Sequence, residues 1–294
     1  MGGLPVSENV CQNCDREERK KRGYLCEKIA TEDGLPARCI HPESVVKLNV
    51  LNYYLEIFCV AMKKTFENRY FVDLFSGPGA CYEKKSGKFH SGSPLIALNL
   101  KPPFTDYIFV DLDRKTSEIL KKRCQSQLGD IFETIRFLNF DSNKNVDAIL
   151  EHLEILKSIS VILIDPNGLD IEYETVKKLA YCNSIDLIIN FSIFDLKRNE
   201  VNYRKEGSKA DKFFGTPEWR NVGPRYWLNL YKKQLGKLGF VGIETSNEHH
   251  ITIRTPTGAP IYHLIYASKN KLGLKFWRAA KKRFSKPDIL DQRY

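Results

Sequence analysis

Short apolar runs alternate with amphipathic stretches through the middle of the chain. Runs rich in β-branched and aromatic side chains predict strands at residues 70–75, 107–110, 135–140, 160–164 and 185–189. Apolar residues at helical spacing predict helices at residues 44–62, 93–100, 117–127, 146–156 and 173–180. Strands and helices that alternate in this way build a parallel sheet with helices on both faces. The pattern therefore predicts an α/β fold with a doubly wound, mostly parallel, Rossmann-like sheet.

The pattern changes at both ends of this central region. Residues 227–238 and 275–283 have helical spacing, and apolar runs at 239–244 and 261–267 predict antiparallel edge strands that complete the sheet. The first 43 residues hold clustered cysteines and few apolar side chains. We therefore expect four parts, namely a cysteine-rich module at 1–43, a cofactor-binding core at 44–196, a basic and aromatic insertion at 197–238, and edge strands with a basic helix at 239–294.

A polar residue lies at or near the carboxyl end of each of the five predicted parallel strands. In chain order these residues are Asp73, Asp111, Asp141, Asp165 and Asn190. Ligands of doubly wound sheets bind outside the carboxyl ends of the strands. Core packing does not require an acid at four successive strand ends, so the set predicts a ligand site there.

A glycine turn follows the first predicted strand. It reads Phe75-Ser-Gly77-Pro-Gly79, and glycine lets the backbone come close to a ligand. A dinucleotide fingerprint needs a third glycine and an acid about 20 positions later, whereas Asp111 follows Gly79 by 32 positions. This spacing disfavours NAD, and the absence of a GxxxxGK[ST] sequence excludes a P-loop.

The turn and the strand-end acids together are typical of S-adenosylmethionine methyltransferases. In this interpretation the turn admits the methionine part of the cofactor. Asp111 accepts hydrogen bonds from the ribose hydroxyls, and Asp141 accepts one from the adenine amino group. The predicted cofactor-binding residues are Asp73, Phe75, Gly77, Gly79, Asp111 and Asp141.

The fourth strand ends in Asp165-Pro166-Asn167-Gly168. In amino-group methyltransferases this segment reads [DNS]-P-P-[YFW]; the first side chain and the proline carbonyl hold the amine, and the ring stacks on the base. The acidic residue and the proline are present here, but the ring is missing, so Phe191 or Phe194 would supply it. The predicted catalytic residues are Asp165, Pro166, Asn167 and Phe191.

Four of the eight cysteines lie within the first 39 residues, as Cys11-x2-Cys14-x11-Cys26-x12-Cys39, and His41 follows. A Cys-x2-Cys pair can present two thiolates to one ion, and two further ligands complete a tetrahedral zinc site. A short segment with little to bury needs such a staple. We predict zinc on these four cysteines, with His41 as the alternative to Cys39. An iron–sulfur cluster and a flexible tail with incidental cysteines are the other interpretations.

The net charge of +10 has a definite location. Residues 197–294 hold 21 basic and 8 acidic side chains, so the whole excess lies in the last third. Basic residues interleaved with aromatic rings predict contacts with phosphates and unpaired bases. The predicted nucleic-acid contacts are Arg198, Arg204, Lys205, Lys209, Lys212 and Arg220. The alternative is a helical insertion with solvated lysines and a buried aromatic stripe.

The sequence also bears on where in the cell the protein is expected. No apolar run reaches the roughly 18–20 residues of a membrane span, and the first residues lack a secretory pattern. We therefore expect a cytoplasmic protein without a membrane span.

Several motifs resemble the three-Cys-motif partner (TcmP) family over roughly residues 45–280. The matching segments are Tyr70–Gly79, Gly92–Ala97, Ile164–Gly168, Ile189–Phe191 with Arg198, and Tyr266–Asn270. The family resembles class I methyltransferases in fold. The resemblance implies a prokaryotic, cytoplasmic protein that acts with a partner carrying a cysteine triplet, and it names no substrate. The N-terminal cysteine module is an addition to the family pattern.

The leading hypothesis is a methyltransferase that acts on nucleic acid, with an amino group of a base as the favoured acceptor. A non-catalytic adaptor that binds nucleic acid or protein is the first alternative, because Asn167-Gly168 replaces the proline and the ring. A nuclease is the second alternative, because Asp165, Asp170 and Glu172 could hold Mg²⁺.

Overall fold

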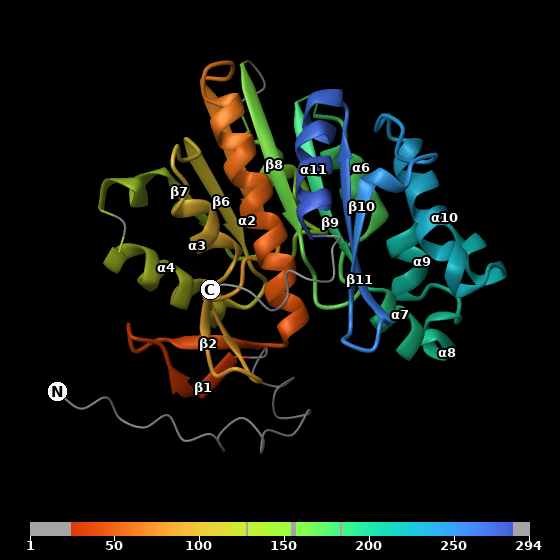
Figure 1. Ribbon diagram of the computed structural model, residues 1–294, viewed down its shortest axis with the longest axis horizontal. Coiled ribbons are helices and arrows are strands. Elements are labelled where there is room, and N and C mark those ends of the chain that lie inside the picture. Colours follow the sequence, from red (N-terminus) through yellow and green to blue (C-terminus); the bar gives the residue numbers. More distant parts are fainter. Residues whose placement is uncertain (1–24, 128, 154–156, 183, 285–294) are drawn as a thin grey trace.

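The structure, a computed structural model, describes residues 25–127, 129–153, 157–182 and 184–284. Within them the chain forms a seven-stranded sheet and a four-stranded sheet (Figure 1). The large sheet has the order β10-β11-β9-β8-β3-β6-β7. Its strands are β3 (Asn68–Asp73), β6 (Asp106–Val110), β7 (Ile135–Leu138), β8 (Ser158–Ile164), β9 (Ile185–Phe191), β10 (His250–Arg254) and β11 (Pro260–Ser268).

Five neighbouring strands of the large sheet are parallel, in the order β7-β6-β3-β8-β9. Numbered along the chain, this is the order 3-2-1-4-5 of a doubly wound fold, whose winding reverses between β3 and β8. β11 is antiparallel to β9, and β10 is antiparallel to β11. The predicted doubly wound, mostly parallel sheet is confirmed.

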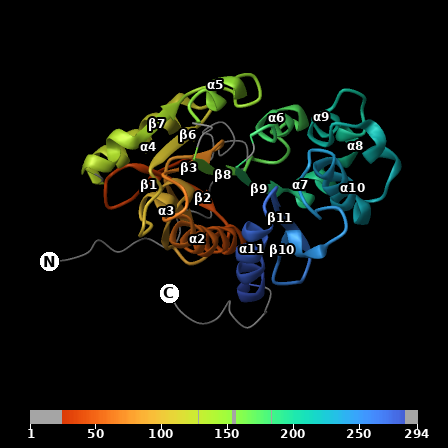
Figure 2. The ribbon, with the colours of Figure 1, turned by 90° about the horizontal axis from the view of Figure 1, so that it is seen from above.

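Helices cover both faces of the large sheet (Figure 2). One face packs against α2 (Pro42–Met62), α3 (Ser93–Leu98), α4 (Arg114–Gln127) and α11 (Lys271–Phe284). The other packs against α5 (Val146–Leu150), α6 (Tyr173–Leu179), α7 (Ile193–Arg198), α9 (Lys209–Phe214) and α10 (Pro224–Gly236). The remaining helices are α8 (Glu200–Tyr203) and the 3₁₀ turns η1 (Gly129–Thr134), η2 (Pro217–Asn221) and η3 (Asn247–His249).

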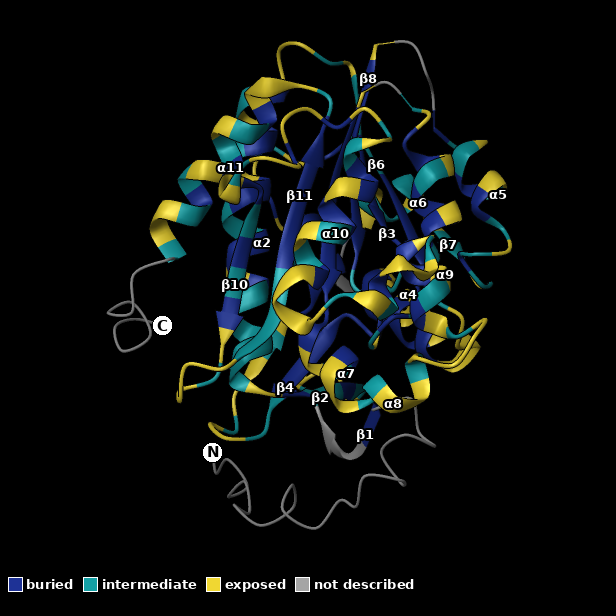
Figure 3. Cartoon of the chain, turned by 90° about the vertical axis from the view of Figure 1, so that its right-hand side faces the viewer, coloured by how far each residue is buried: buried dark blue, intermediate teal, exposed yellow. Residues whose placement is uncertain are grey.

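Successive residues of a strand point in turn into the two halves of the core, one on each face of the sheet. In β3, Tyr70 and Val72 join one apolar cluster, while Phe71 between them joins the other. This period of two follows from the pleat of a strand. All residues of β8 and β9 are buried, as expected for central parallel strands. Figure 3 shows the central strands of the sheet in dark blue, while β10 and β11 are partly teal, and the outer faces of the helices are largely yellow.

One predicted strand is wrong. Residues 237–239 and 241–245 form turns, with Gly239 and Gly242 at positive φ, and the edge strand is β10 instead. β10 alternates polar residues with the buried Ile251 and Ile253, which is the pattern of a half-buried edge strand. The apolar composition of 239–244 reflects Phe240 and Ile243, which are buried in the core without joining the sheet.

Helix α2 is long and apolar enough to cross a membrane by length and composition alone, which the sequence analysis did not find. Its apolar residues pack inside the protein, however. Tyr54, Leu55 and Phe58 are buried, and they contact the sheet and α11. In this structure α2 therefore serves as a core helix.

The small sheet lies at the carboxyl ends of the parallel strands (Figure 1). Its order is β1-β2-β4-β5, with bounds β1 (Leu25–Ala30), β2 (Pro36–Ile40), β4 (Ala80–Glu83) and β5 (Phe89–Ser91). β2 is parallel to β4, which begins directly after the glycine turn. The N-terminal hairpin of β1 and β2 is thus hydrogen-bonded to a strand that follows the turn.

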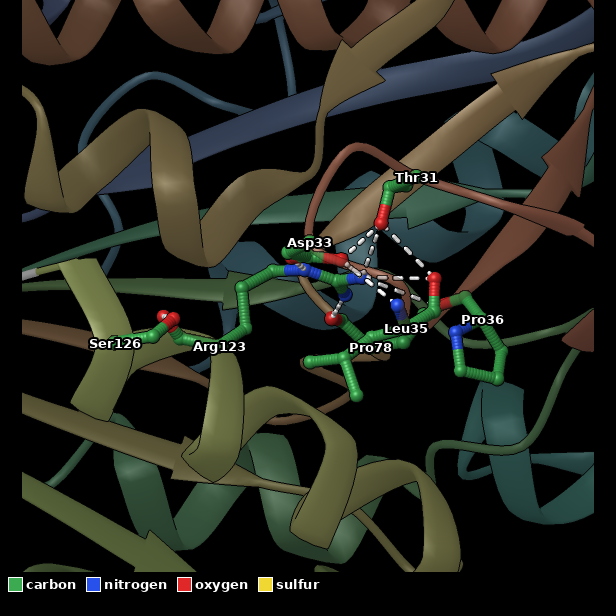
Figure 4. Close-up of polar contacts among 7 residues, drawn as sticks. All are labelled: Thr31, Asp33, Leu35, Pro36, Pro78, Arg123 and Ser126. Atoms are coloured by element: carbon green, nitrogen blue, oxygen red, sulfur yellow. Dashed lines mark hydrogen bonds and ion pairs between the residues drawn. The ribbon is translucent and has the colours of Figure 1, made fainter. Parts of the chain in front are cut away.

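A buried arginine fastens this hairpin to the core (Figure 4). Arg123 of α4 is 1% exposed, and its Nε lies 2.5 Å from Asp33 Oδ2 in the hairpin turn. Its Nη2 donates to Asp33 Oδ1 at 3.1 Å and to the Leu35 and Pro36 carbonyls at 3.3 Å. Its Nη1 donates to the Pro78 carbonyl in the glycine turn. One guanidinium therefore joins the hairpin, the turn and α4.

The charge on Asp33 is part of this contact. Burial would raise its pKa, but hydrogen bonds from Arg123, Thr31 and the Leu35 amide outweigh burial and lower the pKa to about 2. A carboxyl whose pKa is lower in the folded state contributes stability above its unfolded pKa. The Asp33 contribution is therefore present at neutral pH and is lost as the pH falls from about 4 towards 2.

We predict that Arg123→Met lowers the free energy of unfolding by roughly 3 kcal/mol, because it leaves the Asp33 charge without its buried partner. Arg114→Met on the same helix is the matched control. Arg114 pairs with Glu118 in a contact whose side chains are 83% and 56% exposed, and its loss changes stability by less than about 1 kcal/mol. Urea unfolding at pH 7 measures both variants. Equal losses in the two variants would contradict this role of Arg123.

Candidate active site

The carboxyl ends of the parallel strands surround a cavity of about 640 Å³. It lies beside the point where the winding of the sheet reverses, which is the expected place for a ligand. Four strand-end loops and two outlying segments supply its wall. The lining includes Leu74, Phe75, Pro78, Asp111–Asp113, Phe140–Asn143, Asn167, Leu169, Asp170 and Glu172, with Arg38, Lys209 and Lys212 from outside these loops.

The structure brings some of the predicted residues to this cavity and leaves others away from it. Of the predicted site residues, the cavity is lined by Phe75, Asp111, Asp141, Asn167, Lys209 and Lys212. Asp73, Gly77, Gly79, Asp165, Pro166 and Phe191 are not part of its wall. The acceptor side predicted at Asp165 and Pro166 therefore lies outside the cavity wall, while Asn167 of the same segment lines it.

The glycine turn needs its glycines. Gly77 and Gly79 have φ of +65° and +86°, a region that L side chains rarely adopt. A Cβ on Gly79 would also lie 2.8 Å from Leu120 Cδ1 of α4. The Gly77 amide donates to Asp111 Oδ2 at 2.9 Å, so the turn is joined to the end of the next strand.

Asp111 is held by two backbone amides. Oδ1 accepts from the Asp113 amide and Oδ2 from the Gly77 amide, each at 2.9 Å. Burial raises the pKa of Asp111, although these amides and the charge of Arg38 oppose the rise. Each carboxylate oxygen retains a lone pair, so Asp111 can still accept hydrogen bonds from a ligand in the cavity.

Asp73 ends β3 beneath the glycine turn and is fully buried. Its Oδ1 accepts from the Phe75 amide at 3.1 Å, while Oδ2 has no hydrogen-bond partner within the described residues. Burial, followed by the charges of Asp165 and Asp111, raises its pKa to about 7 against the opposing hydrogen bonds from Ser93 and Phe75. A carboxyl whose pKa is raised this far is neutral over a wider pH range, which is how burial without a charged partner is tolerated.

Asn143 joins two of the lining loops, and the sequence analysis missed it. Its Nδ2 donates to the Asp170 carbonyl at 2.8 Å, and its Oδ1 accepts from the Glu172 amide at 2.9 Å. The Asn143 amide in turn donates to Asp141 Oδ1 at 2.9 Å. The loops after β7 and β8 therefore form one rigid wall. A lone asparagine after a strand gave no sequence signal for this contact.

The Asp165 carboxylate already has two partners. Lys47 Nζ lies 2.7 Å from Oδ1 and 2.6 Å from Oδ2, and Asn190 Nδ2 donates to Oδ1 at 2.8 Å. Lys47 also lies over the Tyr262 ring, 5.2 Å from its centroid. Asn190 Oδ1 is buried and has no hydrogen-bond partner in the described part of the chain. No sequence pattern indicates this contact, because Lys47 precedes Asp165 by 118 positions.

The role predicted for Phe191 is wrong. Its side chain is fully buried and packs against Phe213, Phe214 and Tyr231 in the core. It therefore cannot present a ring to a substrate. Phe194, the alternative, is 51% exposed, and the Arg198 guanidinium lies over its ring.

Most of the predicted phosphate-binding residues have carboxylate partners inside the chain. Arg198 pairs with Asp195, Arg204 with Glu200, Lys209 with Asp170, Lys212 with Glu172 and Arg220 with Asp211. Four of these five basic side chains are at least 39% exposed, while that of Arg220 is 24% exposed. Exposed pairs of this kind contribute about 0–1 kcal/mol each, so a phosphate can replace the carboxylate. Lys205 is exposed as well.

Of the predicted zinc ligands, Cys26, Cys39 and His41 lie within the described residues. Cys11 and Cys14 lie outside the described residues. Cys26 of β1 is opposite Ala37 of β2, and Cys39 follows Ala37 by two positions, so Cys26 and Cys39 share one face of the small sheet. Within the described residues no group of three or more His, Cys, Asp and Glu could hold a metal. The zinc site therefore stays a prediction.

The positions of three acidic residues disfavour the nuclease alternative. Asp165, Asp170 and Glu172 are all described, and they do not form a metal-binding group. Each pairs with a different lysine, namely Lys47, Lys209 and Lys212. The three carboxylates are thus not brought to one ion, and the predicted Mg²⁺ site is not formed.

Comparisons with known proteins bear on the fold. No family model and no curated protein matches the sequence. Protein LPL1258 from Legionella pneumophila, of the family DUF519, matches with a TM-score of 0.50 and 9% identity over 81% of this chain and 92% of that one. At this identity the match bears on the fold alone.

Two complexes with S-adenosyl ligands match less well. Trm1 from Pyrococcus horikoshii, with S-adenosyl-L-methionine, has a TM-score of 0.46 and 10% identity over 84% of this chain and 60% of that one. Magnesium protoporphyrin IX methyltransferase from Synechocystis, with bound SAH, has a TM-score of 0.44 and 14% identity over 86% and 94%. The resemblance to the three-Cys-motif partner family stays a prediction.

The raised pKa of Asp73 gives a test of the site's electrostatics. A buried carboxyl that stays protonated to about pH 7 disfavours folding progressively above its unfolded pKa, because the unfolded state loses its proton first. We expect the free energy of unfolding of Asp73→Asn to rise relative to that of wild type as the pH increases from 4 to 7. The difference should grow by up to about 1.4 kcal/mol per pH unit. Urea unfolding across this range measures the difference. A difference that does not change with pH would show that Asp73 is ordinarily charged.

Proposed function

We propose that the protein is an S-adenosylmethionine-dependent methyltransferase. The observation that carries the proposal is the cavity at the carboxyl ends of β3, β6, β7 and β8, whose wall includes Phe75 and Pro78 of the glycine turn and Asp111, which is hydrogen-bonded to that turn. Its volume suits a ligand of this size. When bound, the cofactor supplies an electrophilic methyl group on a sulfonium.

The residues present fit this cofactor. Asp111 has free lone pairs for the ribose hydroxyls. Asp141 and the exposed side chain of Leu112 line the cavity where an adenine would lie. Asp73, which is fully buried and outside the cavity wall, holds the start of the glycine turn by accepting a hydrogen bond from the Phe75 amide. These features support the fit of the cofactor to the cavity.

Binding of S-adenosylhomocysteine by calorimetry tests the cofactor half. We expect wild type to bind and Asp111→Ala to lose at least about tenfold in affinity, because one charged hydrogen bond is worth about 1.5–3 kcal/mol. Asp106→Ala, at the opposite end of the same strand, is the matched control and should bind like wild type. An Asp111→Ala variant that binds as tightly as Asp106→Ala would refute the cofactor assignment.

The acceptor side favours an amino group. A carboxylate offers about four lone-pair sites, and Lys47 and Asn190 occupy three of those of Asp165. One site on Oδ2 remains, and the unpartnered Asn190 Oδ1 is a second acceptor nearby. Two acceptors suit the two N–H groups of a primary amine. In this proposal Lys47 fixes Asp165, while Asp165 and the backbone at Pro166 and Asn167 orient the amine.

Nucleic acid is the substrate class that we propose. The support is the excess of 13 positive charges in residues 197–294 and the exposed basic side chains of α7 to η2. Lys209 and Lys212 also line the cavity itself. Phe194, with Arg198 over its ring, offers an exposed face on which a base can stack.

Transfer of labelled methyl groups to RNA and DNA pools tests the acceptor half. We expect Asp165→Ala and Lys47→Met to lower the transfer rate at least about 100-fold, as loss of substrate positioning does, while S-adenosylhomocysteine affinity stays unchanged. Lys64→Met, at the far end of α2, is the control. Normal transfer by Asp165→Ala would contradict the role of Asp165. Cofactor binding without any transfer by wild type would favour the adaptor instead.

Three further expectations belong to the same proposal. Zinc on Cys11, Cys14, Cys26 and either Cys39 or His41 would stabilise the small sheet, since Cys26 and Cys39 share one of its faces. A partner protein with a cysteine triplet and a cytoplasmic location follow from the family resemblance. Metal analysis of the full chain decides the first of these.

A further inference from the structure

Arg38 lies in β2, outside the doubly wound core, yet its side chain lines the cavity. In the register of the small sheet it stands beside Cys81 of β4. Its guanidinium lies against the glycine turn, because a Cβ built on Gly77 would be 3.4 Å from Arg38 Nη1. The N-terminal hairpin therefore places a positive charge at the turn that the cofactor would contact.

The Arg38 guanidinium has no hydrogen bond and no ion pair within the described residues. Other partly or fully buried arginines differ, since Arg123 pairs with Asp33 and Arg220 with Asp211. The charge of Arg38 acts on Asp111, but Asp111 accepts its hydrogen bonds from backbone amides. A half-buried charge without a partner is unfavourable unless a ligand supplies one. The cavity therefore has a position for an anionic group.

We propose that Arg38 binds the carboxylate of the cofactor's amino-acid end, an inference that rests on the proposed function. The planar fork of a guanidinium pairs with a carboxylate through two parallel hydrogen bonds. An amino-acid end also carries an ammonium group, which the carboxylates in the cavity wall would attract. A phosphate fits less well, because it carries more negative charge than a carboxylate and has no ammonium group to offset it, while Asp111, Asp113 and Asp141 line the same cavity.

The hairpin is held where this role requires it. Arg123 donates to the carbonyl of Pro36, two residues before Arg38, and to the carbonyl of Pro78 in the glycine turn. Both sides of the proposed carboxylate site are thus fixed to one buried guanidinium. The N-terminal hairpin becomes a part of the cofactor site, and Arg38 a binding residue that the strand-end pattern could not indicate.

The experiment compares two ligands by calorimetry on the full chain. S-adenosylhomocysteine carries the amino-acid end, whereas 5′-methylthioadenosine has the same adenosine and sulfur without it. We expect Arg38→Met to weaken S-adenosylhomocysteine binding about 30-fold, as loss of a charge-assisted pair does, and to change 5′-methylthioadenosine binding less than about twofold. Arg38→Lys should lie between the two, because an ammonium keeps the charge without the fork.

Arg136→Met is the matched control, since Arg136 is half-exposed on β7 and away from the cavity. The methyl ester of S-adenosylhomocysteine tests the same contact on wild type, and we expect it to lose a similar factor even if Arg38→Met does not fold. An equal loss for both ligands, or no loss with the methyl ester, would overturn the role of Arg38. Failure of wild type to bind S-adenosylhomocysteine at all would instead overturn the proposed function, and this inference with it.

Discussion

The buried guanidinium of Arg123 is the contact on which the candidate site depends. It lies on α4, and it bonds to Asp33 and Leu35 in the hairpin turn and to Pro78 in the glycine turn. These three segments are far apart in sequence, and this one guanidinium joins them. Because removing one side of a buried ion pair leaves a charge without compensation, the hairpin, the turn and the helix keep one relative arrangement.

This arrangement makes two sheets into one site. The doubly wound sheet places Asp73, Asp111 and Asp141 at one edge, and the small sheet adds Arg38 across the glycine turn. The cavity between them is thus acidic where hydroxyl and amino groups would bind, and basic where a carboxylate would. On the acceptor side, Lys47 of α2 neutralises Asp165 in the same way. Arg38 and Lys47, which both precede the first strand of the large sheet, therefore complete both halves of the proposed site.

The parts that the sequence predicted are those that local patterns determine. Alternation of strands and helices predicted the parallel sheet, and its topology then placed the strand-end acids together. Long-range pairings left no such pattern: β2 pairs with β4 across some 40 positions, and Lys47 meets Asp165 across 118. At residues 239–244 a local pattern was misleading. Their apolar composition suggested a strand, but Gly239 and Gly242 at positive φ place turns there. Phe191 was misplaced since a ring at a strand end can face the core as readily as the ligand.

A crystal structure of the full chain with S-adenosylhomocysteine tests the account most directly. The account predicts the ribose hydroxyls on Asp111 and the ligand carboxylate within hydrogen-bond distance of the Arg38 guanidinium, beside the glycine turn. A ligand bound with its carboxylate away from Arg38 would contradict the part assigned to the hairpin. A ligand bound elsewhere, with the cavity at the carboxyl ends of β3 and β6 left empty, would contradict the whole assignment.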